Sequence, residues 1–443
     1  MQYDEEALKD FNKAILIWPE NSDALNNRGI SKQRLKRYEE ALKDFNKSLE
    51  LNPKSKEAFN NRGNTLKRLG RYSNSIQDYN KALSIDWQQV ETLNNRGLSF
   101  EQIGEFDKAL ADYDKAISLK PDYAEPYFNK SLQKLLLGDF ASGWDLYEWR
   151  WKTEQNIGKK LDISKPVWNG QKDASVFLWA EQGIGDEIMF ASLIPELEER
   201  CSNLTVKCDE RLIPLFERSF SKKINFQFDQ NKVTEDSYDF HIPIASLPSI
   251  FRPSLDSFKQ ASGAYLYCDV KRVEELRKTI LKDKAEILVG ISWNSSAKQP
   301  GAHHRNITLS DLAKHLHAPG VRLVNLQYGD VTAEIIKLKD DHGIEVTQVP
   351  DVDNRNDIDG LAALIMACDE VISIDNATVH LSGALGAKTK ILLPFNRNWQ
   401  WGTSGSSSYW YSSVELYRQQ LADDWKQVLE QLKVHIETTV NAL

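Results

Sequence analysis

Small, aromatic and proline positions recur at intervals of 34 residues over the first third of the chain. The small series contains Gly29, Gly63 and Gly97, the aromatic series Phe45, Tyr79, Tyr113 and Tyr147, and the proline series Pro19, Pro53 and Pro121. A small residue lets the two helices of a repeat approach closely, and an aromatic ring fills the groove against the next repeat. Proline ends a helix because it has no N–H to donate. The pattern therefore predicts a stack of helix pairs.

Complete repeats are expected at residues 24–57, 58–91 and 92–125. A half repeat at residues 1–18 precedes them and a divergent fourth repeat follows, so the array covers residues 1–152. These registers resemble those of the tetratricopeptide family, which implies an all-α superhelix whose concave face holds a partner. An array normally begins with a polar capping element. The apolar edge of the half repeat therefore predicts self-association through residues 1–18.

An asparagine recurs at one repeat position, at Asn27, Asn61, Asn95 and Asn129. Along one wall of a superhelix these side chains form a ladder that can hydrogen-bond an extended peptide backbone regardless of its sequence. This arrangement resembles that of the large protein O-GlcNAc transferases. The alternative is that the asparagines bond within the array. A second periodic set is expected on solvated faces or in ion pairs between repeats: Arg28, Arg62 and Arg96 with Asp44, Asp78 and Asp112.

Beyond the array, short apolar runs alternate with helical segments. The runs predict strands at residues 176–180, 204–208, 224–228, 240–244, 287–293, 321–326, 344–346, 370–374 and 390–393. We expect the first intervening helix at residues 186–200 and a closing helix at residues 423–439. Alternation of strands and helices predicts βαβ units and parallel sheets.

The predicted strands fall into two series that are separated by a break near residues 269–284. This division predicts an α/β region of two Rossmann-like lobes, residues 173–275 and 276–443. The polar stretch at residues 153–172 is expected to link them to the array. In such folds ligands bind at the carboxyl ends of the strands, here in the cleft between the lobes.

A glycine-containing turn follows the first strand of the first lobe. Gly183 and Gly185 belong to this turn, and Asp186 stands on the first turn of the helix that follows. Free backbone N–H groups at such a helix start face the cleft. Asp186 is therefore a candidate catalytic carboxylate, although aspartate is equally favoured as a plain helix N-cap.

A buried strand late in the second lobe also ends at an aspartate and turns into a helix with small residues. The turn contains Asp375, Asn376 and Ala377, and His380 lies on the first or second turn of the helix. The helix start offers N–H donors and a positive dipole end to a diphosphate. His380 is then placed to hydrogen-bond a phosphate oxygen, and a purely structural histidine is the alternative.

The loop after the first strand of the second lobe concentrates positive charge. Its candidate residues are Trp293, Lys298, His303, His304 and Arg305. Such a loop can neutralise a leaving diphosphate, and a solvated surface loop is the alternative. The two histidines are not expected to bind a metal, because adjacent side chains diverge and no third ligand is apparent.

Together these motifs resemble one family. The segments that carry the resemblance are residues 181–190 (EQGIGDEIMF), 373–386 (SIDNATVHLSGALG), 325–327 (NLQ), 143–151 (GWDLYEWRW), 398–401 (NWQW) and 408–411 (SYWY). They are similar to the heptosyltransferase-like glycosyltransferases of the GT-B fold, specifically bacterial proteins that append this domain to tetratricopeptide repeats. The resemblance covers nearly the whole chain.

The resemblance implies an inverting, metal-independent glycosyltransferase that moves a sugar from a nucleotide-sugar donor to an acceptor, with no further cofactor. It implies that Asp186 deprotonates the acceptor as a general base, and that the repeats recruit a protein or peptide acceptor through the asparagine ladder. The implied donor-binding residues are Gly183, Gly185, Trp293, Lys298, Arg305, Gln327, Tyr328, Asp375, Asn376, Ala377 and His380. One departure is that Asn376 stands where the family usually has threonine or serine.

Two other functions remain open on the sequence. One is a non-catalytic interaction scaffold whose GT-B domain is degenerate. The other is a phosphorylase or epimerase, since these enzymes share the two-lobed architecture. The intact Asp186 and Asp375 favour the transferase over the scaffold.

Composition narrows the partners and the compartment. A net charge of −8 argues against a nucleic-acid partner, which normally requires a basic surface. No run approaches the ~20 apolar residues of a membrane span. The acidic start has no apolar stretch, so no secretory signal is expected and the cytoplasm is the predicted location. The four cysteines lack CxxC spacing and are expected to be structural thiols.

Overall fold

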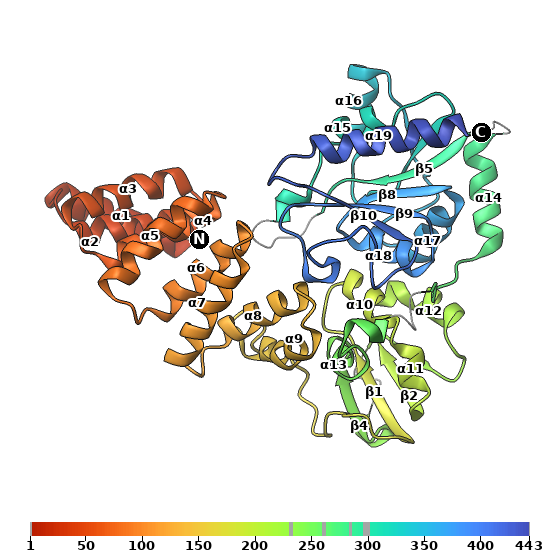
Figure 1. Cartoon of the computed structure of the whole chain (residues 1–443), viewed down its shortest axis with the longest axis horizontal. Helices are drawn as coiled ribbons and strands as arrows, with labels where there is room; N and C mark the ends of the chain where they lie inside the picture. The colour runs from red at the N-terminus through yellow and green to blue at the C-terminus, as the bar shows by residue number, and fades with distance from the viewer. Residues whose placement is uncertain (1, 230–233, 259–262, 283–285, 296–301, 443) are drawn as a thin grey trace. The chain divides into compact units, whose positions relative to one another are not determined.

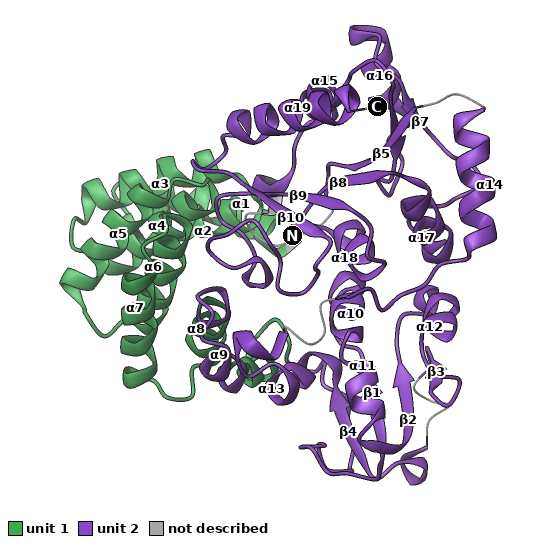
Figure 2. Ribbon diagram, turned by 45° about the vertical axis from the view of Figure 1, so that its right-hand side comes forward, with its two compact units in different colours: residues 1–133, 146–157 green, residues 134–145, 158–443 purple. Residues whose placement is uncertain are grey.

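The computed structural model describes residues 2–229, 234–258, 263–282, 286–295 and 302–442. The chain folds into two compact units (Figure 2). One unit contains residues 1–133 and 146–157, and the other contains residues 134–145 and 158–443. The first unit is all-α, and the second carries both β-sheets.

Helix pairs build the first unit, as the repeat pattern predicts. Their bounds are α1 (Gln2–Ile17), α2 (Ser22–Arg34), α3 (Tyr38–Leu51), α4 (Lys56–Arg68), α5 (Tyr72–Ile85), α6 (Val90–Gln102), α7 (Phe106–Leu119), α8 (Ala124–Leu136) and α9 (Phe140–Tyr147). A short 3-10 helix, η1 (Glu148–Lys152), follows α9. The division between the units passes through α8 and α9. No helix in the described residues is both long enough and apolar enough to cross a membrane.

The periodic glycines allow the two helices of a repeat to touch. A Cβ atom placed on Gly63 of α4 would lie 2.7 Å from the Tyr79 ring of α5, and one on Gly29 would lie 2.7 Å from Phe45. Both aromatic rings are fully buried. The rings therefore pack on the glycine of their own repeat, and Tyr79 also contacts Ser99 of the next repeat, as the sequence pattern predicts.

The turn inside each repeat requires a left-handed backbone at one fixed position. Gly70, Gly104 and Gly138 occupy it with φ of 73°, 77° and 83°. The first repeat has Lys36 there, with φ of 61°. Glycine adopts this conformation without the steric cost that Cβ imposes. Lysine is thus an exception in the series, and its Cβ bears this steric cost.

The periodic arginines and aspartates form ion pairs within a repeat. Arg62 of α4 holds Asp78 of α5 through two hydrogen bonds, from Nε at 2.7 Å and from Nη2 at 2.6 Å. Its Nη1 donates to Asn46 of the preceding repeat at 2.8 Å. Arg28 and Arg96 repeat both contacts. The expectation of ion pairs between repeats is therefore corrected: the carboxylate lies in the same repeat, and the asparagine makes the link to its neighbour.

The first lobe of the second unit contains a parallel sheet in the order β3-β2-β1-β4. Its strands are β1 (Ala174–Trp179), β2 (Cys201–Lys207), β3 (Asn225–Gln227) and β4 (Phe240–Pro243). The helices of this lobe are α10 (Ile184–Ala191), α11 (Ile194–Glu198), α12 (Ile213–Ser219) and α13 (Leu247–Phe251). Each strand matches a predicted one to within a few residues.

The second lobe contains a larger parallel sheet in the order β10-β9-β8-β5-β6-β7. Its strands are β5 (Ile287–Ser292), β6 (Val321–Asn325), β7 (Val346–Thr347), β8 (Glu370–Ile374), β9 (Thr389–Leu393) and β10 (Val414–Arg418). The helices are α14 (Val270–Leu281), α15 (Leu309–Leu316), α16 (Thr332–His342), α17 (Ile358–Ala367), α18 (Ala377–Ala384) and α19 (Lys426–Asn441). Figure 1 shows α15 and α19 on one face of this sheet and α17 and α18 on the other. The prediction of two parallel sheets is confirmed.

Three details differ from the prediction. The expected helix at residues 186–200 is two helices, because Pro195 in the first turn of α11 cannot continue the preceding helix. Strand β10 was not predicted. The expected break near residues 269–284 contains α14, which begins at the Asp269 N-cap.

The end of the expected linker joins the first sheet. Trp168 N donates to the His241 carbonyl at 2.8 Å, and His241 N donates to the Pro166 carbonyl at 3.1 Å. The Trp168 indole is buried and stacks on Phe251 with ring centroids 6.0 Å apart. Residues 166–168 are thus part of the first lobe.

Candidate active site

The site lies where α10 of the first lobe meets α18 of the second. Each of these helices follows a parallel strand, α10 after β1 and α18 after β8, so both begin at the carboxyl edge of a sheet. A Cβ atom on Gly185 would lie 3.1 Å from Cδ2 of His380 and 3.4 Å from Cα of Ala377. Glycine therefore allows the two helix starts to approach, and it brings together the two motifs that the sequence predicts at the cleft.

Asp186 is the third residue of α10. The N-cap position is Gly183, so Asp186 is not the N-cap; its carboxylate instead accepts from the Gly183 N–H, as the third residue of a capping box does. Burial and the neighbouring charge of Asp375 raise the pKa of Asp186 to about 6, against the opposing effects of the Gly183 N–H and of Arg305. A carboxylate with this pKa can accept a proton near neutral pH.

Asp375 directly follows β8 and is almost completely buried. Asn398 Nδ2 donates to its Oδ2 at 2.5 Å. Arg305 Nη1 donates to its backbone carbonyl at 3.0 Å and lies 3.6 Å from its carboxylate. Arg305 is therefore in the site, as predicted for the basic loop. The role of Asn398 was missed, because it lies on a loop far from Asp375 in sequence.

Asn376 uses its side chain inside the protein. Its Oδ1 accepts hydrogen bonds from Thr378 N at 3.0 Å and Ser373 Oγ at 3.1 Å. Its Nδ2 donates to Ser292 Oγ at 2.8 Å and to the Asn294 carbonyl at 3.3 Å. The structure thus makes Asn376 the N-cap of α18 and a tie to the end of β5. The donors and acceptors of this side chain thus have internal partners, and its contact with the donor stays a prediction.

Gln327 has a similar internal role. Its Oε1 accepts from the backbone N–H groups of Trp293 at 2.9 Å and Asn294 at 2.7 Å. The Trp293 indole lies in the apolar core of the second lobe and donates to Glu334 at 3.1 Å. The predicted donor contact of the Trp293 side chain is therefore corrected, since the strand β5 directs this large ring into the core. Tyr328, next in the chain, is half-buried.

His380 is buried between the two lobes. Its ring stacks on Trp401 with centroids 5.3 Å apart, and burial lowers its pKa to about 4. Its Nδ1 lies 3.0 Å from the Tyr411 hydroxyl, which is bonded to Tyr265. Tyr265 donates to the Ile188 carbonyl of α10 at 2.7 Å.

The direction of each hydrogen bond in this His380–Tyr411–Tyr265 network is set by its last acceptor, the Ile188 carbonyl. A carbonyl can only accept, so the single hydroxyl hydrogen of Tyr265 goes to it. Tyr411 then donates to Tyr265, and His380 donates from Nδ1 to Tyr411. The neutral ring therefore keeps a lone pair on Nε2. This tautomer suits a hydroxyl donor better than the phosphate oxygen expected from the sequence.

The rest of the basic loop is only partly described. Lys298 lies outside the described residues. His304 Nδ1 is 2.6 Å from Asp423 Oδ1, and this contact attaches the loop to the segment before α19. Within the described ranges, no three His, Cys, Asp or Glu side chains are grouped to hold a metal ion.

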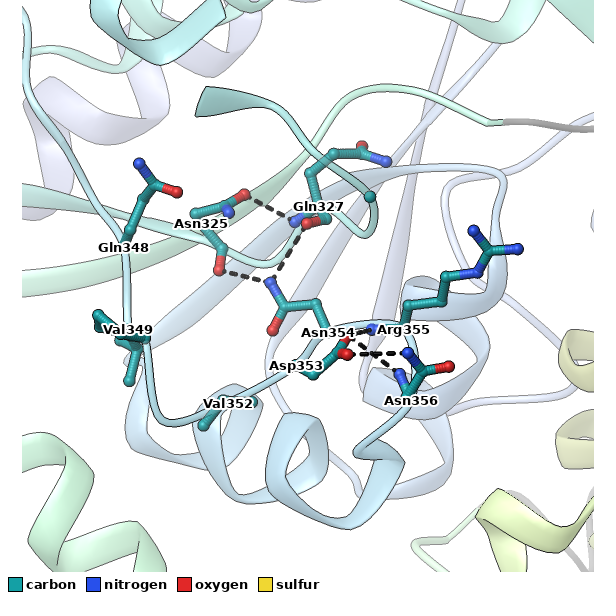
Figure 3. A pocket seen from close by; sticks show the side chains of 11 residues that line it. Asn325, Gln327, Gln348, Val349, Val352, Asp353, Asn354, Arg355 and Asn356 are labelled. Carbon is teal, nitrogen blue, oxygen red and sulfur yellow. Dashed lines mark hydrogen bonds between the residues drawn. The ribbon is translucent and has the colours of Figure 1, made fainter. Parts of the chain in front are cut away.

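A pocket of about 490 Å³ lies at the carboxyl ends of β6 and β7. Asn354 donates from Nδ2 to the carbonyls of Asn325 at 3.0 Å and Gln327 at 3.2 Å, and its side chain points toward them (Figure 3). Its Oδ1 is buried and has no hydrogen-bond partner among the described residues. Gln348 and Val349 line the opposite side. Only Gln327 was predicted here, because the residues after β7 carry no recognisable motif.

The predicted asparagine ladder lies on α2, α4, α6 and α8. Asn61 donates from Nδ2 to Asn26 of the preceding repeat at 3.1 Å, and Asn129 donates to Asn94 in the same way at 2.8 Å. Asn95 accepts from Lys67 Nζ at 2.8 Å. Asn27, at the start of the ladder, is exposed. Asn61, Asn95 and Asn129 thus link neighbouring repeats, and the contact of the ladder with a peptide stays a prediction.

The N-terminal edge of the array exposes apolar side chains. Leu16, Ile17 and Trp18 are 83%, 85% and 60% exposed. A pocket of about 450 Å³ separates α1 from the start of α2, with Phe11 and Trp18 among its lining residues. This is the edge for which the sequence predicts self-association.

Comparison with known proteins supports the repeats and extends beyond them. Residues 22–55, 57–86 and 90–123 match the tetratricopeptide repeat family. Protein FlbA of Caulobacter vibrioides is 32% identical over 299 residues, which are 63% of this chain and 49% of that protein. The chain thus spans about half the length of this curated relative. An alignment of this length exceeds the repeat array and reaches into the α/β region.

Solved structures give more distant similarities. The crystal structure of MamA is 21% identical, with a TM-score of 0.32, and the match covers 35% of this chain and 92% of that chain. The crystal structure of YrrB, a tetratricopeptide protein with an unusual peptide-binding site, is 18% identical, with a TM-score of 0.27 and coverage of 35% and 74%. The family match shows that residues 22–55, 57–86 and 90–123 are tetratricopeptide repeats, and the same chain carries an α/β region of parallel sheets.

Proposed function

We propose that the chain is an inverting glycosyltransferase that moves a sugar from a nucleotide-sugar donor to a protein or peptide acceptor. One observation carries this proposal. Asp186 and Asp375 follow strands of two different parallel sheets. They lie at the facing starts of α10 and α18, with Arg305 beside Asp375. Strand ends of two lobes are where doubly wound folds bind ligands.

In the proposed reaction the acceptor attacks the anomeric carbon of the donor sugar. Asp186 takes the proton of the acceptor as the new glycosidic bond forms. The bond from the anomeric carbon to the diphosphate oxygen breaks, and the diphosphate leaves with the electron pair. Attack opposite the leaving group inverts the configuration at that carbon. The raised pKa of Asp186 supports this role, because a base that titrates near neutral pH is efficient.

The diphosphate is proposed to lie at the start of α18, where the backbone N–H groups and the helix dipole favour negative charge. Arg305 supplies a positive charge next to this position. The pocket beside Asn354 is proposed to hold the nucleoside, with Asn354 Oδ1 accepting an N–H of the base. Gln327, Ser292 and Asn376 connect the pocket to the start of α18 through hydrogen bonds.

The repeats are proposed to recruit the acceptor. In this proposal the ladder asparagines bind the backbone of the acceptor. Asn61 and Asn95 have a second role, because they also take part in contacts between repeats. Replacing Asn61 and Asn95 together by alanine is expected to reduce transfer to a protein acceptor. Unchanged transfer would remove the peptide-groove part of the proposal and leave the donor part intact.

The second candidate is a non-catalytic interaction scaffold. It is favoured by the internal bonding of Asn376, Gln327 and Trp293, since these three side chains were expected to meet the donor. The relation to FlbA and the tetratricopeptide repeats are equally compatible with a scaffold.

Thermal unfolding with UDP-, GDP-, ADP- and CMP-sugars distinguishes the two candidates. A donor at 100 times its Kd should add about 2.7 kcal/mol to the stability. Asn354→Ala should lose this stabilisation, whereas the exposed Asn203→Ala should keep it. Asp186→Asn should bind the donor and transfer no sugar. If none of the four classes stabilises the chain, the scaffold is favoured.

A further inference from the structure

Helix α9 belongs to the fourth repeat by sequence, yet its first part packs in the α/β unit. Phe140 is buried and touches both lobes of that unit. Its ring centroid lies 5.0 Å from that of Phe258 in the first lobe and 5.8 Å from that of Tyr409 in the second. The three rings form one cluster, because Phe258 also contacts Tyr409 at 5.4 Å.

Trp144, one helical turn later, makes a second pair of contacts of the same kind. Its indole N–H donates to the Arg252 carbonyl in the first lobe at 2.9 Å. Its ring packs edge-to-face on Trp399 of the second lobe, with a centroid distance of 5.2 Å and an interplanar angle of 88°. The ring is 2% exposed. Helix α9 is therefore attached to both lobes by two side chains on one face.

Trp399 begins the short helix η8 (Trp399–Trp401), which holds the second-lobe half of the candidate site. The residue before it, Asn398, donates to Asp375 at 2.5 Å. The last residue of η8, Trp401, stacks on His380. A displacement of Trp399 would therefore also move Asn398 and Trp401, which contact Asp375 and His380.

Trp399 also contacts the first-lobe half of the site. Phe190 lies on α10, one helical turn after Asp186, and its ring stacks on Trp399 at 6.4 Å and 17°. One indole therefore touches both α9 and the helix that carries the proposed base. An edge-to-face contact such as that of Trp144 on Trp399 favours one orientation of the ring.

We propose that Trp144 is a positioning residue for the candidate site. It acts through Trp399, which sets η8 so that Asn398 and Trp401 hold Asp375 and His380 opposite α10. A residue of the fourth repeat thereby completes the α/β unit. This inference rests on the proposed function only in taking the site to be catalytic.

The test follows the His380 ring in the full chain by NMR, with ¹⁵N-labelled histidine. The His380 signals are identified by their loss in His380→Gln. Trp144→Ala should shift them, and Trp144→Phe, which keeps an aromatic ring, should shift them less. The matched control is Trp168→Ala, because Trp168 is equally buried in the same unit but stacks on Phe251 and not on Trp399.

The proposal predicts that Trp144→Ala and Trp168→Ala both lower Tm, while only the first moves the His380 signals. Unchanged His380 signals in the Trp144 variants would overturn it. Equal shifts in Trp144→Ala and Trp168→Ala would also overturn it, because the effect would then be general loosening. If Trp144→Ala does not fold, Trp144→Phe and Trp168→Phe supply the same comparison. The readout needs no donor, so a chain that binds no nucleotide-sugar would end the proposed function without deciding this inference.

Discussion

Gly185 of α10 and His380 of α18 are so close that a Cβ atom on the glycine would lie 3.1 Å from Cδ2 of the imidazole. The contact joins the two lobes at the candidate site. His380 cannot easily withdraw, because its ring is fixed by the stacked Trp401 and by Tyr411. The separation of the two helix starts therefore depends on the absence of a side chain at residue 185.

Gly185→Ala is expected to destabilise the chain by about 1–3 kcal/mol, which is typical of overpacking. The added methyl group must push α10 and α18 apart, so stabilisation by a nucleotide-sugar should fall as well. Urea unfolding with and without the donor measures both effects. Gly263→Ala is the control, because no atom of the described residues lies within 4 Å of a Cβ there. It should change the stability by less than about 1 kcal/mol, and an equal loss in both variants would contradict the close-packing argument.

The raised pKa of Asp186 predicts a pH dependence of transfer. The base works only when it is ionised, so the rate should rise with pH through about 6 and then level off. Asp375→Asn removes the neighbouring negative charge that contributes to this raised pKa. The midpoint of the pH–rate profile should therefore move to lower pH in that variant, and a midpoint that stays in place would show that another group titrates.

The raised pKa of Asp186 also makes the folding stability depend on pH. Stability is expected to fall over the pH range in which the rate of transfer rises. Between the ordinary value of 3.8 and about 6, the folded chain keeps a proton on Asp186 that the unfolded chain has released. Stability should therefore fall as pH rises through this window, by up to about 3 kcal/mol from this group. Asp186→Asn should remove that part of the pH dependence, measured as the difference in Tm between pH 4 and pH 7.

The paired Arg62 and Asp78 should contribute measurably to the repeat array. Their side chains are 24% and 8% exposed, and the arginine makes two hydrogen bonds to the carboxylate. Asp78→Ala should cost about 1.5–3 kcal/mol, because it leaves a partly buried guanidinium without its partner. The control is Glu39→Ala, which breaks a pair with Arg71 whose side chains are 62% and 47% exposed. That loss should stay below about 1 kcal/mol, and similar losses in both variants would assign the periodic pairs a surface role.

The exposed N-terminal edge should drive self-association at high concentration. Its apolar side chains, Leu16 and Trp18 among them, lose contact with water when two copies meet. Sedimentation should detect dimers whose population falls in Leu16→Glu/Trp18→Glu. Val434→Glu on α19 is the control, because Val434 is 59% exposed and lies far along the chain in the other unit. A monomer at high concentration would contradict the prediction.

Much of the fold follows from the sequence, because its signals are local. The glycines and aromatic rings of the array recur at one interval, and each repeat closes through contacts such as Gly63 with Tyr79, 16 residues apart. Buried parallel strands are marked by short apolar runs that need no knowledge of their neighbours. The sequence does not predict strand β10, because the polar residue Glu415 interrupts its apolar run.

The candidate site could be predicted only in part. The sequence locates Asp186 and Asp375, since a strand that ends at a helix start is visible in the local pattern, and it locates Arg305 by the positive charge of its loop. It does not show that Asn376 is bonded internally, because the partner Ser292 lies on another strand.

What the sequence by itself determined is the repeat array, the alternation of strands and helices, and the two strand-to-helix turns that carry Asp186 and Asp375. Only the tertiary structure decided which side chains remain available there. It buried the Trp293 ring in the core and placed Asn398 on Asp375. It also attached Trp144 of the fourth repeat to the α/β unit. The physical reason is the same in each case: burial and hydrogen bonding are settled by neighbours that are distant in the chain, and local patterns do not encode them.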